Sequence, residues 1–514
     1  MRFPLYQMKW LMGFVTIFHS LQGWRQMMSN PKRLHPVALV LGLLRQLREL
    51  AIPFIVFLFI GRENNEFTGW YALAIVGLLV LSLIIGALKW FFFTYRVEEG
   101  ELRIEQGVFV KKRRYIPMER IQSIDFSQGV VQRLFGLVKI QIETAGGGDE
   151  PEAVLSAVTK DDGETLRHQL TEKKSADKEL DDQEEPGKQA IMKKLSRKDL
   201  LIAASTSSGI GVALSFVAAF GSQIDNFIPD AFFITLTEQL IQSSIALIVS
   251  VVLIVLFVSW VLSITGVLLQ YGRFTLVRSG SDLIIERGLL ERRQLTIPVN
   301  RIQAVRMVEG LFRQPFGYAA LHVESGGGGG KEEKFSTVLF PIMRKKNVAS
   351  FLAEVVPEFH STLEVNALPS RSVWRYIIRV LLPVAIIVVP VMIFVPYGKL
   401  SLVLLGGAVL VGYLRYKDAG WNINGSFLTL QFRKFGRVTV LTPRRRIQSS
   451  IIKMSYFQKR KRLASYQISI LSSLSGRHFM VQDMDEDVCA AIFGWYSKPD
   501  SFPRNKDEHI KNDR

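Results

Sequence analysis

Long apolar segments constrain the fold of this chain more than any other feature of its sequence. A bilayer core of about 30 Å requires roughly 20 predominantly apolar residues in a helix. Backbone groups inside a bilayer must bond to one another, so such segments are predicted to be transmembrane helices, arranged here as three hairpins. The segments form three pairs, at residues 37–60 and 70–93, 200–220 and 241–269, and 376–395 and 400–414, of which the last segment is short.

The composition agrees with a membrane protein that faces a reducing compartment. Hydrophobic residues make up 48% of the 514 residues, which is high for a soluble protein. A net charge of +18 favours an anionic partner, either nucleic acid or an acidic lipid surface. Cys489 is the single cysteine, which excludes an intrachain disulfide and a cysteine-based zinc site.

Basic residues at the helix flanks predict the orientation, because short loops rich in Lys and Arg stay in the cytoplasm. Such residues precede the first helix of the first two predicted pairs and surround the start of the first helix of the third, whereas the linker inside each pair is short and carries few cations. They are Lys32 and Arg33, then Lys193, Lys194, Arg197 and Lys198, then Arg371, Arg375 and Arg379. We therefore expect the termini and the polar segments 94–199, 270–375 and 415–514 to be cytoplasmic.

The three polar segments are copies of one unit. The sequence Ile-Pro-Met-Glu-Arg-Ile-Gln at 116–122 recurs 181 residues later as Ile-Pro-Val-Asn-Arg-Ile-Gln at 297–303. The same shift aligns the Phe-Gly pair at 135–136 with that at 316–317. A third copy follows at a shift of 326 from the first, with Pro443 to Gln448, but Lys461-Arg462 replace the Phe-Gly pair. This loss puts the strand connection in the third copy in doubt.

Each copy combines half-buried strands with a terminal helix. Apolar residues alternate with polar ones at Leu102 and Ile104 and again at Val138, Ile140 and Ile142, which is typical of antiparallel strands. Glycine-rich turns follow, and a helical pattern closes each copy at 164–170, 347–356 and 488–496. The predicted class is an α+β membrane protein in which each transmembrane hairpin precedes a small sandwich or barrel with a C-terminal helix.

A transmembrane hairpin followed by a basic β domain with a Pro-x-x-Arg-Ile-Gln strand and a Phe-Gly turn resembles the bacterial pleckstrin-homology-like (bacterial PH) domain of membrane proteins. The resemblance covers about residues 28–500. It implies a bent seven-stranded β-sandwich capped by a helix, and it implies little about activity. It also suggests a companion membrane protein with a single such domain, and hence a hetero-oligomer.

Basic clusters are the candidate contacts to anionic lipid, because cations near a charged leaflet are attracted to it. Alternatively, they only enforce cytoplasmic placement and solubility. Nucleic-acid binding is not expected, because the domains are tethered and contain no recognised nucleic-acid motif. The cluster residues are Lys111, Lys112, Arg113, Arg114, Arg292, Arg293, Arg444, Arg445, Arg446, Lys459, Arg460, Lys461 and Arg462.

Two further sets of residues carry structural and functional alternatives. The repeated motif is predicted to be structural, although its guanidinium groups also suit phosphate; it comprises Pro117, Arg120, Gln122, Pro298, Arg301, Gln303, Pro443, Arg446 and Gln448. Arg45, Arg48 and Glu49 stand inside the first apolar segment, where charge is costly and often functional. Alternatively, they form an interfacial first turn before a short, tilted span.

No catalytic, cofactor or metal site is predicted. The glycine runs lack the Gly-x-x-x-x-Gly-Lys-Ser/Thr pattern of a phosphate loop, and the seven histidines show no metal-ligand spacing. We therefore expect a non-enzymatic envelope protein whose domains bind the anionic inner leaflet or partner proteins. Defence against membrane-active antimicrobial peptides (bacteriocins) is the alternative, and a transporter is a third possibility with less support.

The predicted organisation assigns every residue of the chain. Residues 1–27 are either an over-extended start before Met28 or an interfacial segment. The remaining boundaries are 28–93 for the first hairpin, 94–172 for the first domain, 173–199 for a charged linker, 200–269 for the second hairpin, 270–360 for the second domain, 361–414 for the third hairpin, 415–500 for the third domain and 501–514 for a polar tail.

Overall fold

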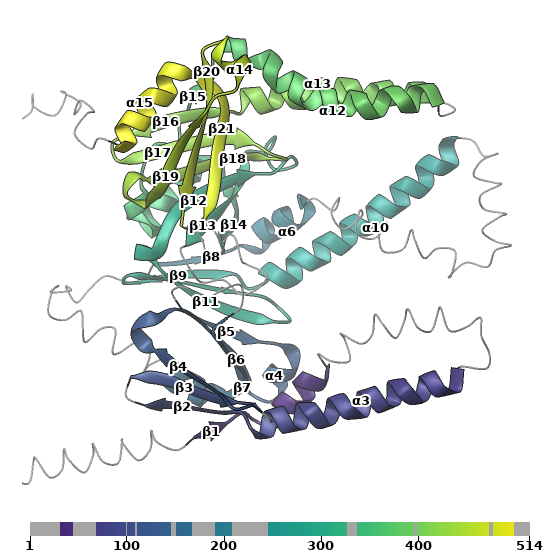
Figure 1. The fold of residues 1–514 in the computed structure, drawn as a ribbon, viewed down its shortest axis with the longest axis vertical. Coiled ribbons are helices and arrows are strands. Elements are labelled where there is room, and N and C mark those ends of the chain that lie inside the picture. Colours follow the sequence, from purple (N-terminus) through teal and green to yellow (C-terminus); the bar gives the residue numbers. More distant parts are fainter. Residues whose placement is uncertain are drawn as a thin grey trace, which may run out of the picture. The chain divides into compact units, whose positions relative to one another are not determined.

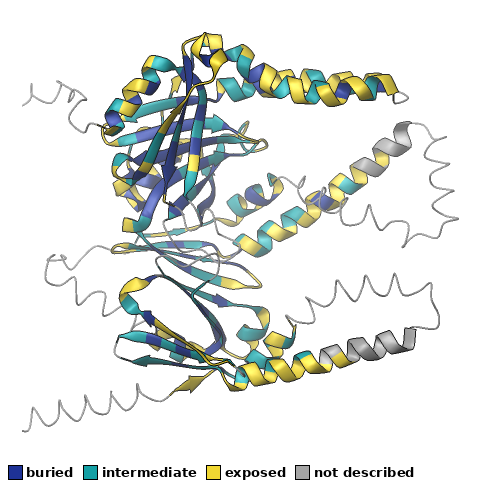
Figure 2. Ribbon diagram, in the orientation of Figure 1, coloured by how far each residue is buried: buried dark blue, intermediate teal, exposed yellow. Residues whose placement is uncertain are grey.

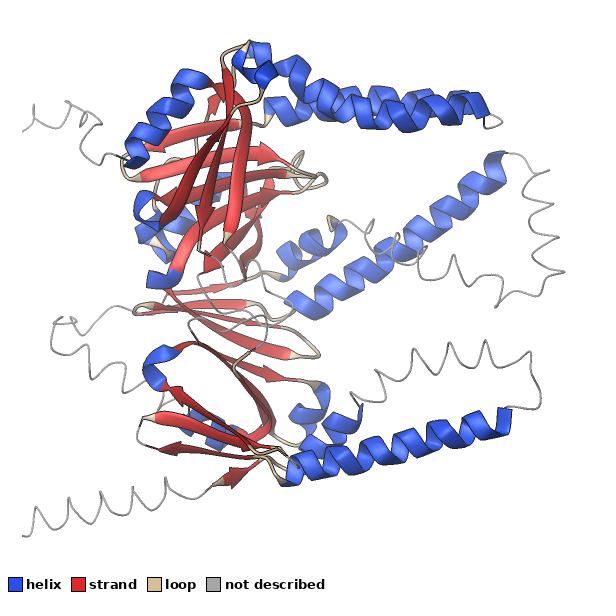
Figure 3. Cartoon of the chain, viewed as in Figure 1, coloured by secondary structure: helices blue, strands red, loops and turns tan. Residues whose placement is uncertain are grey.

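The computed structural model describes residues 31–44, 68–98, 100–107, 110–144, 151–166, 191–207, 245–325, 337–394, 398–471 and 476–497. These residues form long helices and antiparallel sheets (Figure 3). They divide into two compact units: unit 1 comprises Met1–Lys188, Leu214–Leu253 and Gly288–Leu295, and unit 2 comprises Gln189–Ala213, Ile254–Arg287 and Thr296–Arg514.

Unit 1 contains the first domain. The strands of one sheet follow the order β1 (Lys32–Arg33), β2 (Thr94–Glu98), β3 (Glu101–Gln106) and β4 (Lys112–Pro117), with α3 (Thr68–Phe91) leading into β2. After η2 (Met118–Arg120), the strands β5 (Ile121–Gln128), β6 (Leu137–Thr144) and β7 (Ala153–Thr159) pair in sequence order, with α4 (Val130–Leu134) between β5 and β6. Leu102, Ile104, Ile140 and Ile142 are buried in its core, as their alternation predicts.

The second domain repeats this order. Its elements are β8 (Ile191–Lys194), α6 (Arg197–Ser205), α10 (Ile245–Tyr271), β9 (Thr275–Ser279), β10 (Asp282–Arg287), β11 (Arg292–Pro298), η3 (Val299–Arg301), β12 (Ile302–Glu309), β13 (Tyr318–Ser325), β14 (Thr337–Arg344), η4 (Lys345–Asn347), α11 (Val348–Val355) and η5 (Pro357–Phe359). In α11, Val348, Phe351, Leu352 and Val355 are buried at helical spacing, so this helix packs its apolar face inward.

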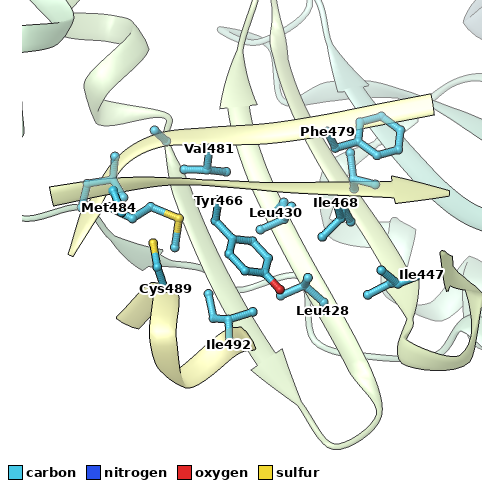
Figure 4. Packing of buried hydrophobic residues seen from close by; sticks show 14 of the residues in the cluster. Leu428, Leu430, Ile447, Tyr466, Ile468, Phe479, Val481, Met484, Cys489 and Ile492 are labelled. Carbon is cyan, nitrogen blue, oxygen red and sulfur yellow. The ribbon is translucent and has the colours of Figure 1, made fainter. Parts of the chain in front are cut away.

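The third domain lies wholly in unit 2. Its elements are β15 (Asn366–Ala367), η6 (Ser370–Ser372), α12 (Val373–Phe394), η7 (Gly398–Ser401), α13 (Leu402–Lys417), β16 (Gly420–Asn424), β17 (Phe427–Arg433), β18 (Arg437–Pro443), η8 (Arg444–Arg446), β19 (Ile447–Lys453), α14 (Tyr456–Lys459), β20 (Leu463–Ile470), β21 (Arg477–Asp485) and α15 (Glu486–Ser497). Figure 4 shows its core, where Tyr466 and Ile468 of β20 meet Leu428 and Leu430 of β17, and Ile492 comes from α15.

One sheet runs through the second and third domains. Its order is β14-β13-β12-β18-β17-β16-β15, so β12 of the second domain pairs directly with β18 of the third. The separate sheet β19-β20-β21 completes the third domain, with β19 at one edge (Figure 1).

Three helices are long and apolar enough to cross a membrane within the described ranges: Leu253–Tyr271, Ser370–Phe394 and Gly398–Lys417. The third of these contains the short segment 400–414, which is therefore longer in the structure than in the sequence pattern. Helices α12 and α13 lie side by side, and most of their surface is exposed (Figures 1 and 2). The first segments of the other two predicted pairs, 37–60 and 200–220, lie mostly outside the described residues.

Candidate membrane-facing surface

Strand register shows which end of the third domain adjoins its apolar helices. Helix α13 ends at Lys417, and Gly420 at the start of β16 pairs with Gln431 near the end of β17. The buried Asp418 then binds Arg433, with 2.5 Å between Oδ2 and the guanidinium. The turn between β17 and β18 is therefore beside the end of α13, and we call this end of each domain the helix-proximal end.

The strand tip, which is the β3–β4, β10–β11 or β17–β18 connection, exposes an apolar side chain at this end of each domain. In the third domain Phe435 is 88% exposed, and in the second domain Leu290 is 54% exposed. The first-domain tip carries Val110, which is 71% exposed. The first and second domains have the same arrangement, because Thr94, just after α3, pairs with Glu105, and Thr275, just after α10, pairs with Glu286. The strand tip that follows Glu105 or Glu286 is therefore beside the end of the apolar helix, as in the third domain.

A second connection, the helical tip at residues 455–462, reaches the same end of the third domain. Tyr456 is 72% exposed and Phe457 67% exposed, whereas Gln458 is buried between them and the domain. The Gln458 amide donates to Asp483 Oδ1 at 2.8 Å. Asp483 is fully buried and also accepts from Arg375, at 2.7 Å, in the first turns of α12. The helical tip is thus fixed beside the start of an apolar helix.

The corresponding helical tips of the other domains have the same neighbours. In the second domain, the Arg313 guanidinium donates to the Ala203 carbonyl at 3.1 Å and to Thr206 Oγ1 at 3.2 Å, at the end of α6. In the first domain, Val131 packs against a small buried cluster that includes Val37, in the helix that begins the first apolar segment. The exposed apolar residues of these tips are Val130, Leu134, Phe135, Leu311, Phe312 and Phe316.

The third copy keeps the turn that its sequence puts in doubt. Gly136 and Gly317 have φ values of 65° and 67°, and Arg462, which replaces them, has a φ of 50°. All three residues are in the left-handed region that favours glycine. The Phe-Gly pair is therefore not required for this strand connection.

Most of the predicted basic clusters lie at the helix-proximal end. Lys111 and Lys112 stand at the start of β4, where Lys112 pairs with Gln106, and Arg113 and Arg114 follow. Arg292 and Arg293 begin β11, and Lys459 to Arg462 lie in the helical tip of the third domain. Several of these cations have partners, including Arg113 with Glu105 at 3.5 Å and Arg293 with Glu291 at 3.1 Å.

Arg444, Arg445 and Arg446, which were predicted together with the other lipid contacts, lie at the opposite end of the third domain. They follow Pro443, which is six residues beyond Arg437 along β18, or about 20 Å at the usual strand rise. Arg444 donates to the Tyr496 carbonyl at 2.8 Å and stacks over the Trp495 ring. These three arginines are therefore left out of the membrane-facing surface.

The repeated motif also lies at this far end, where Pro117, Pro298 and Pro443 end a strand and Arg120, Arg301 and Arg446 end a short 3-10 helix. Burial lowers the pKa of Arg301, and nearby Asp282 partly offsets this. The Gln303 amide donates to the Arg301 carbonyl at 2.9 Å, and the Gln448 carbonyl accepts from the Tyr496 hydroxyl at 3.1 Å. The side chain of Gln122 lies outside the described residues.

Buried ion pairs join the second and third domains, and sequence patterns did not reveal them. Glu309 of β12 is 1% exposed and accepts from Arg437 Nε of β18 at 2.7 Å. This hydrogen bonding raises the pKa of Arg437. Glu324, equally buried, bridges Arg306 at 3.1 Å and Arg477 at 2.7 Å. Each of these two carboxylates binds an arginine of the third domain, so a shift between the domains would leave a buried charge without its partner. The pairs therefore fix the register between the two domains.

A groove of about 1370 Å³ lies between the second and third domains. Arg344, Lys345, Lys346 and Arg437 are among its lining residues, together with the linker 362–365. The side chains of Arg344 and Lys346 form no hydrogen bond or ion pair with any described residue. Phosphate oxygens are suitable ligands for such a set of donors.

The remaining candidate sites are the intramembrane charges, metal-binding clusters and the single cysteine. Arg45, Arg48 and Glu49 lie outside the described residues. Among the residues that the structure describes, no group of His, Cys, Asp and Glu could hold a metal ion. Cys489 is buried, and this burial, with Asp485 and Glu486 nearby, raises the pKa of its thiol to about 12.

Comparison with known proteins relates these domains to others. Residues 41–174, 228–358 and 378–500 match the family model described as Bacterial PH domain. The chain is 39% identical over 490 residues to the UPF0699 transmembrane protein YdbT of Bacillus subtilis (strain 168), covering 92% of this chain and 99% of that protein. It is 35% identical over 74 residues to the UPF0699 transmembrane protein YdbS of the same organism, covering 14% of this chain and 46% of that protein. No solved structure matches the chain.

Proposed function

The chain belongs to the bacterial PH domain family of transmembrane proteins, and from this premise we propose that it is a non-enzymatic protein whose three domains bind the anionic cytoplasmic leaflet. The binding surface is the set of strand tips and helical tips at the helix-proximal end of each domain. The termini and all three domains face the cytoplasm in this proposal.

The observation that carries the proposal is that exposed apolar side chains recur on tips held beside the apolar helices. Phe435 and Phe457 in the third domain have counterparts in Leu290 and Phe312 of the second. Aromatic and aliphatic side chains on tips beside the apolar helices would enter the lipid headgroup region, and their basic neighbours would contact lipid phosphates. Each Lys or Arg near an anionic surface contributes roughly 1 kcal/mol, so Lys459 to Arg462 make the third domain the strongest contact.

Tethering makes weak contacts sufficient. A domain joined to a membrane helix is at high effective concentration near the headgroups, so its tips can be occupied without high intrinsic affinity. The groove lined by Arg344 and Lys346 supplies a second place for a headgroup phosphate. Because exposed charges are screened over about 8 Å at physiological salt, binding should weaken as salt rises.

We also propose assembly with a separate membrane protein of this family. The match to YdbS spans 74 residues, which is about the length of one domain of this chain. That match supports the existence of related chains with fewer domains.

The test places an environment-sensitive fluorophore on Phe457→Cys in the full chain, in nanodiscs of neutral or anionic lipid. The buried Cys489 should not react. We expect a blue-shifted emission that is larger in anionic lipid and falls with salt. The matched control is Ser426→Cys, which is exposed between β16 and β17 at the far end of the same domain and should report water.

A second variant separates charge from insertion. The variant that combines Lys459→Ser, Arg460→Ser, Lys461→Ser and Arg462→Gly should abolish the difference in emission between neutral and anionic lipid. Residue 462 is changed to glycine because glycine adopts its left-handed backbone without strain. Water-like emission from Phe457→Cys in both lipids would show that the tip does not meet the membrane.

A further inference from the structure

Neighbouring domains of this chain are joined by the same strand pairing. Strand β12 pairs with β18, with Met307 opposite Thr439, Val308 opposite Val438 and Glu309 opposite Arg437. Within unit 1, β5 pairs with the first residues of β11, with Phe126 opposite Gln294, Ser127 opposite Arg293 and Gln128 opposite Arg292. These pairs occupy equivalent positions of the repeat, so both interfaces have one register.

This head-to-tail pairing leaves two strands that have a neighbour on one side only among the described residues. The first strand is β4, the first-domain equivalent of β11 and β18. The second is β19, the third-domain equivalent of β5 and β12. In the described sheets, β4 pairs with β3 alone and β19 with β20 alone. A head-to-tail interface that does not close into a ring leaves such complementary ends.

Side chains are more buried in β12, which has a strand on both sides, than in the edge strand β19. In β12, six of the eight residues are buried, whereas in β19 only Ile447 is buried among its seven. Ile451 and Ile452 of β19 are 40% and 36% exposed. The same repeat position is thus covered in one domain and open in the next.

The two open edges differ in their protection against pairing. Strand β4 begins with Lys112, Arg113 and Arg114, and charged residues are a common device that keeps an edge strand from pairing. Strand β19 is uncharged from Ile447 to Ile452, and its first charge is Lys453. An uncharged, exposed edge is the one that remains available for another strand.

We propose that β19 accepts the β18-type strand of a bacterial PH domain in a separate chain, which extends the sheet β19-β20-β21 antiparallel and in the register used between the domains of this chain. In that register Lys453 takes the position of Val308, so it faces the partner residue equivalent to Val438. The partner carries a neutral or acidic residue there.

A second copy of this chain fits this edge poorly. Its β4 strand would place Lys112 opposite Lys453, and like charges directly opposite one another destabilise a strand pair. The occupant is therefore a different chain, and this inference rests on the proposed assembly and names its surface.

The test is photo-cross-linking in the cells that produce the full chain. A photoreactive residue replaces Ile451 in one sample and Ile452 in another, and Leu471, which is 43% exposed after the end of β20, is the matched control. We expect both β19 positions to cross-link to a β18-type strand of a bacterial PH domain in another chain, identified by sequencing the linked peptide, and Leu471 to give no such product. Absence of the product, linkage to a second copy of this chain, or linkage to a protein of another family would each overturn the proposal.

A substitution series separates the surface from the other proposals. Ile451→Lys with Ile452→Lys should reduce co-purification of the cross-linked partner at least tenfold, whereas Leu471→Lys should not. Lipid-dependent emission from Phe457→Cys should stay unchanged in both, because β19 does not include the tips. If the partner still co-purifies with the β19 variant, the chains assemble through another surface, and this proposal fails while the assembly stands.

Discussion

Arg462 adopts a left-handed backbone that its repeat equivalents reach with glycine, at a cost of about 1–2 kcal/mol for a residue with a β-carbon. We therefore expect Arg462→Gly to keep or raise the stability of the third domain. Arg462→Val should lower it by about 1 kcal/mol, because β-branching worsens the strain. Thermal unfolding of the full chain in micelles measures both. Lys461→Gly is the control and should be slightly destabilising; equal stability of the glycine and valine variants would contradict the strain.

Asp125 of β5 has a buried Oδ1 atom without a hydrogen-bond partner in the described part of the chain. Burial raises the pKa of this carboxyl well above its ordinary value, Glu143 adds to the shift and Arg293 opposes it. The unfolded pKa is about 3.9. The folded state is therefore more stable when Asp125 is protonated. This stabilisation is complete below about pH 4 and is lost as the pH rises towards the pKa of Asp125 in the folded state.

Asp125→Asn should consequently stabilise the first domain at pH 7, by about 1 kcal/mol or more, because it removes a poorly solvated charge. The advantage should shrink towards pH 4, where the wild-type carboxyl becomes neutral. Hydrogen exchange of the β5 and β6 amides reports the local free energy. Asp161→Asn, at an exposed position in the same domain, should change nothing at either pH. An Asp125→Asn variant no more stable than the wild type at pH 7 would show that the carboxylate is well solvated.

Helices α12 and α13 touch at a glycine. A β-carbon on Gly412 would lie 2.6 Å from the Ile377 α-carbon and 3.1 Å from the Tyr376 carbonyl oxygen. Small residues allow such close packing of apolar helices. Gly412→Ala should therefore destabilise the helix pair by about 1–3 kcal/mol, the usual cost of overpacking.

Gly406→Ala is the matched control, because a β-carbon added at Gly406 would have no atom within 4 Å and alanine favours the helix. Thermal midpoints in micelles should fall for Gly412→Ala and stay or rise for Gly406→Ala. Similar midpoints for both variants would mean that the two helices do not depend on this contact.

The strands could be predicted from the sequence, but their neighbours could not. Alternation identified Leu102, Ile104, Ile140 and Ile142 as buried, because period two reports which face of a strand meets the core. It does not report which strand pairs alongside. The β12–β18 pairing depends on Glu309 and Arg437, which are 128 residues apart and which local periodicity does not connect.

The candidate surface was likewise predicted in part. Charge counting grouped Lys459 to Arg462 with Arg444 to Arg446, which lie at opposite ends of the domain, because a cluster of cations carries no information about which end of a strand it occupies. The exposed apolar residues were missed. Their one signal is that Leu290 and Phe435 occupy equivalent positions of the repeat, outside the alternating strands.

For the molecule as a whole, the continuous sheet makes the second and third domains one body within unit 2. Helices α12 and α13 are anchored to that body by Asp483, which binds Arg375 and Arg379 at 2.7 Å each. A displacement of these helices would therefore be transmitted to both domains. In the proposed function, the tips and the β19 edge are the two kinds of contact that this body makes.

The orientation of the molecule gives the last prediction. Basic residues flank the start of each predicted pair, so the domains should be cytoplasmic and the short inner linkers of the pairs external. Cys489 is buried and should not react with a maleimide, so labelling of a chain with one introduced cysteine reports on that position alone. In intact cells, a membrane-impermeant maleimide should label Asn65→Cys, Asn226→Cys and Lys399→Cys, one in each predicted linker, and should not label Ser426→Cys or Lys160→Cys until the cells are opened. Labelling of either domain position in intact cells, or protection of any one linker, would contradict the arrangement of three hairpins that enter from the cytoplasm.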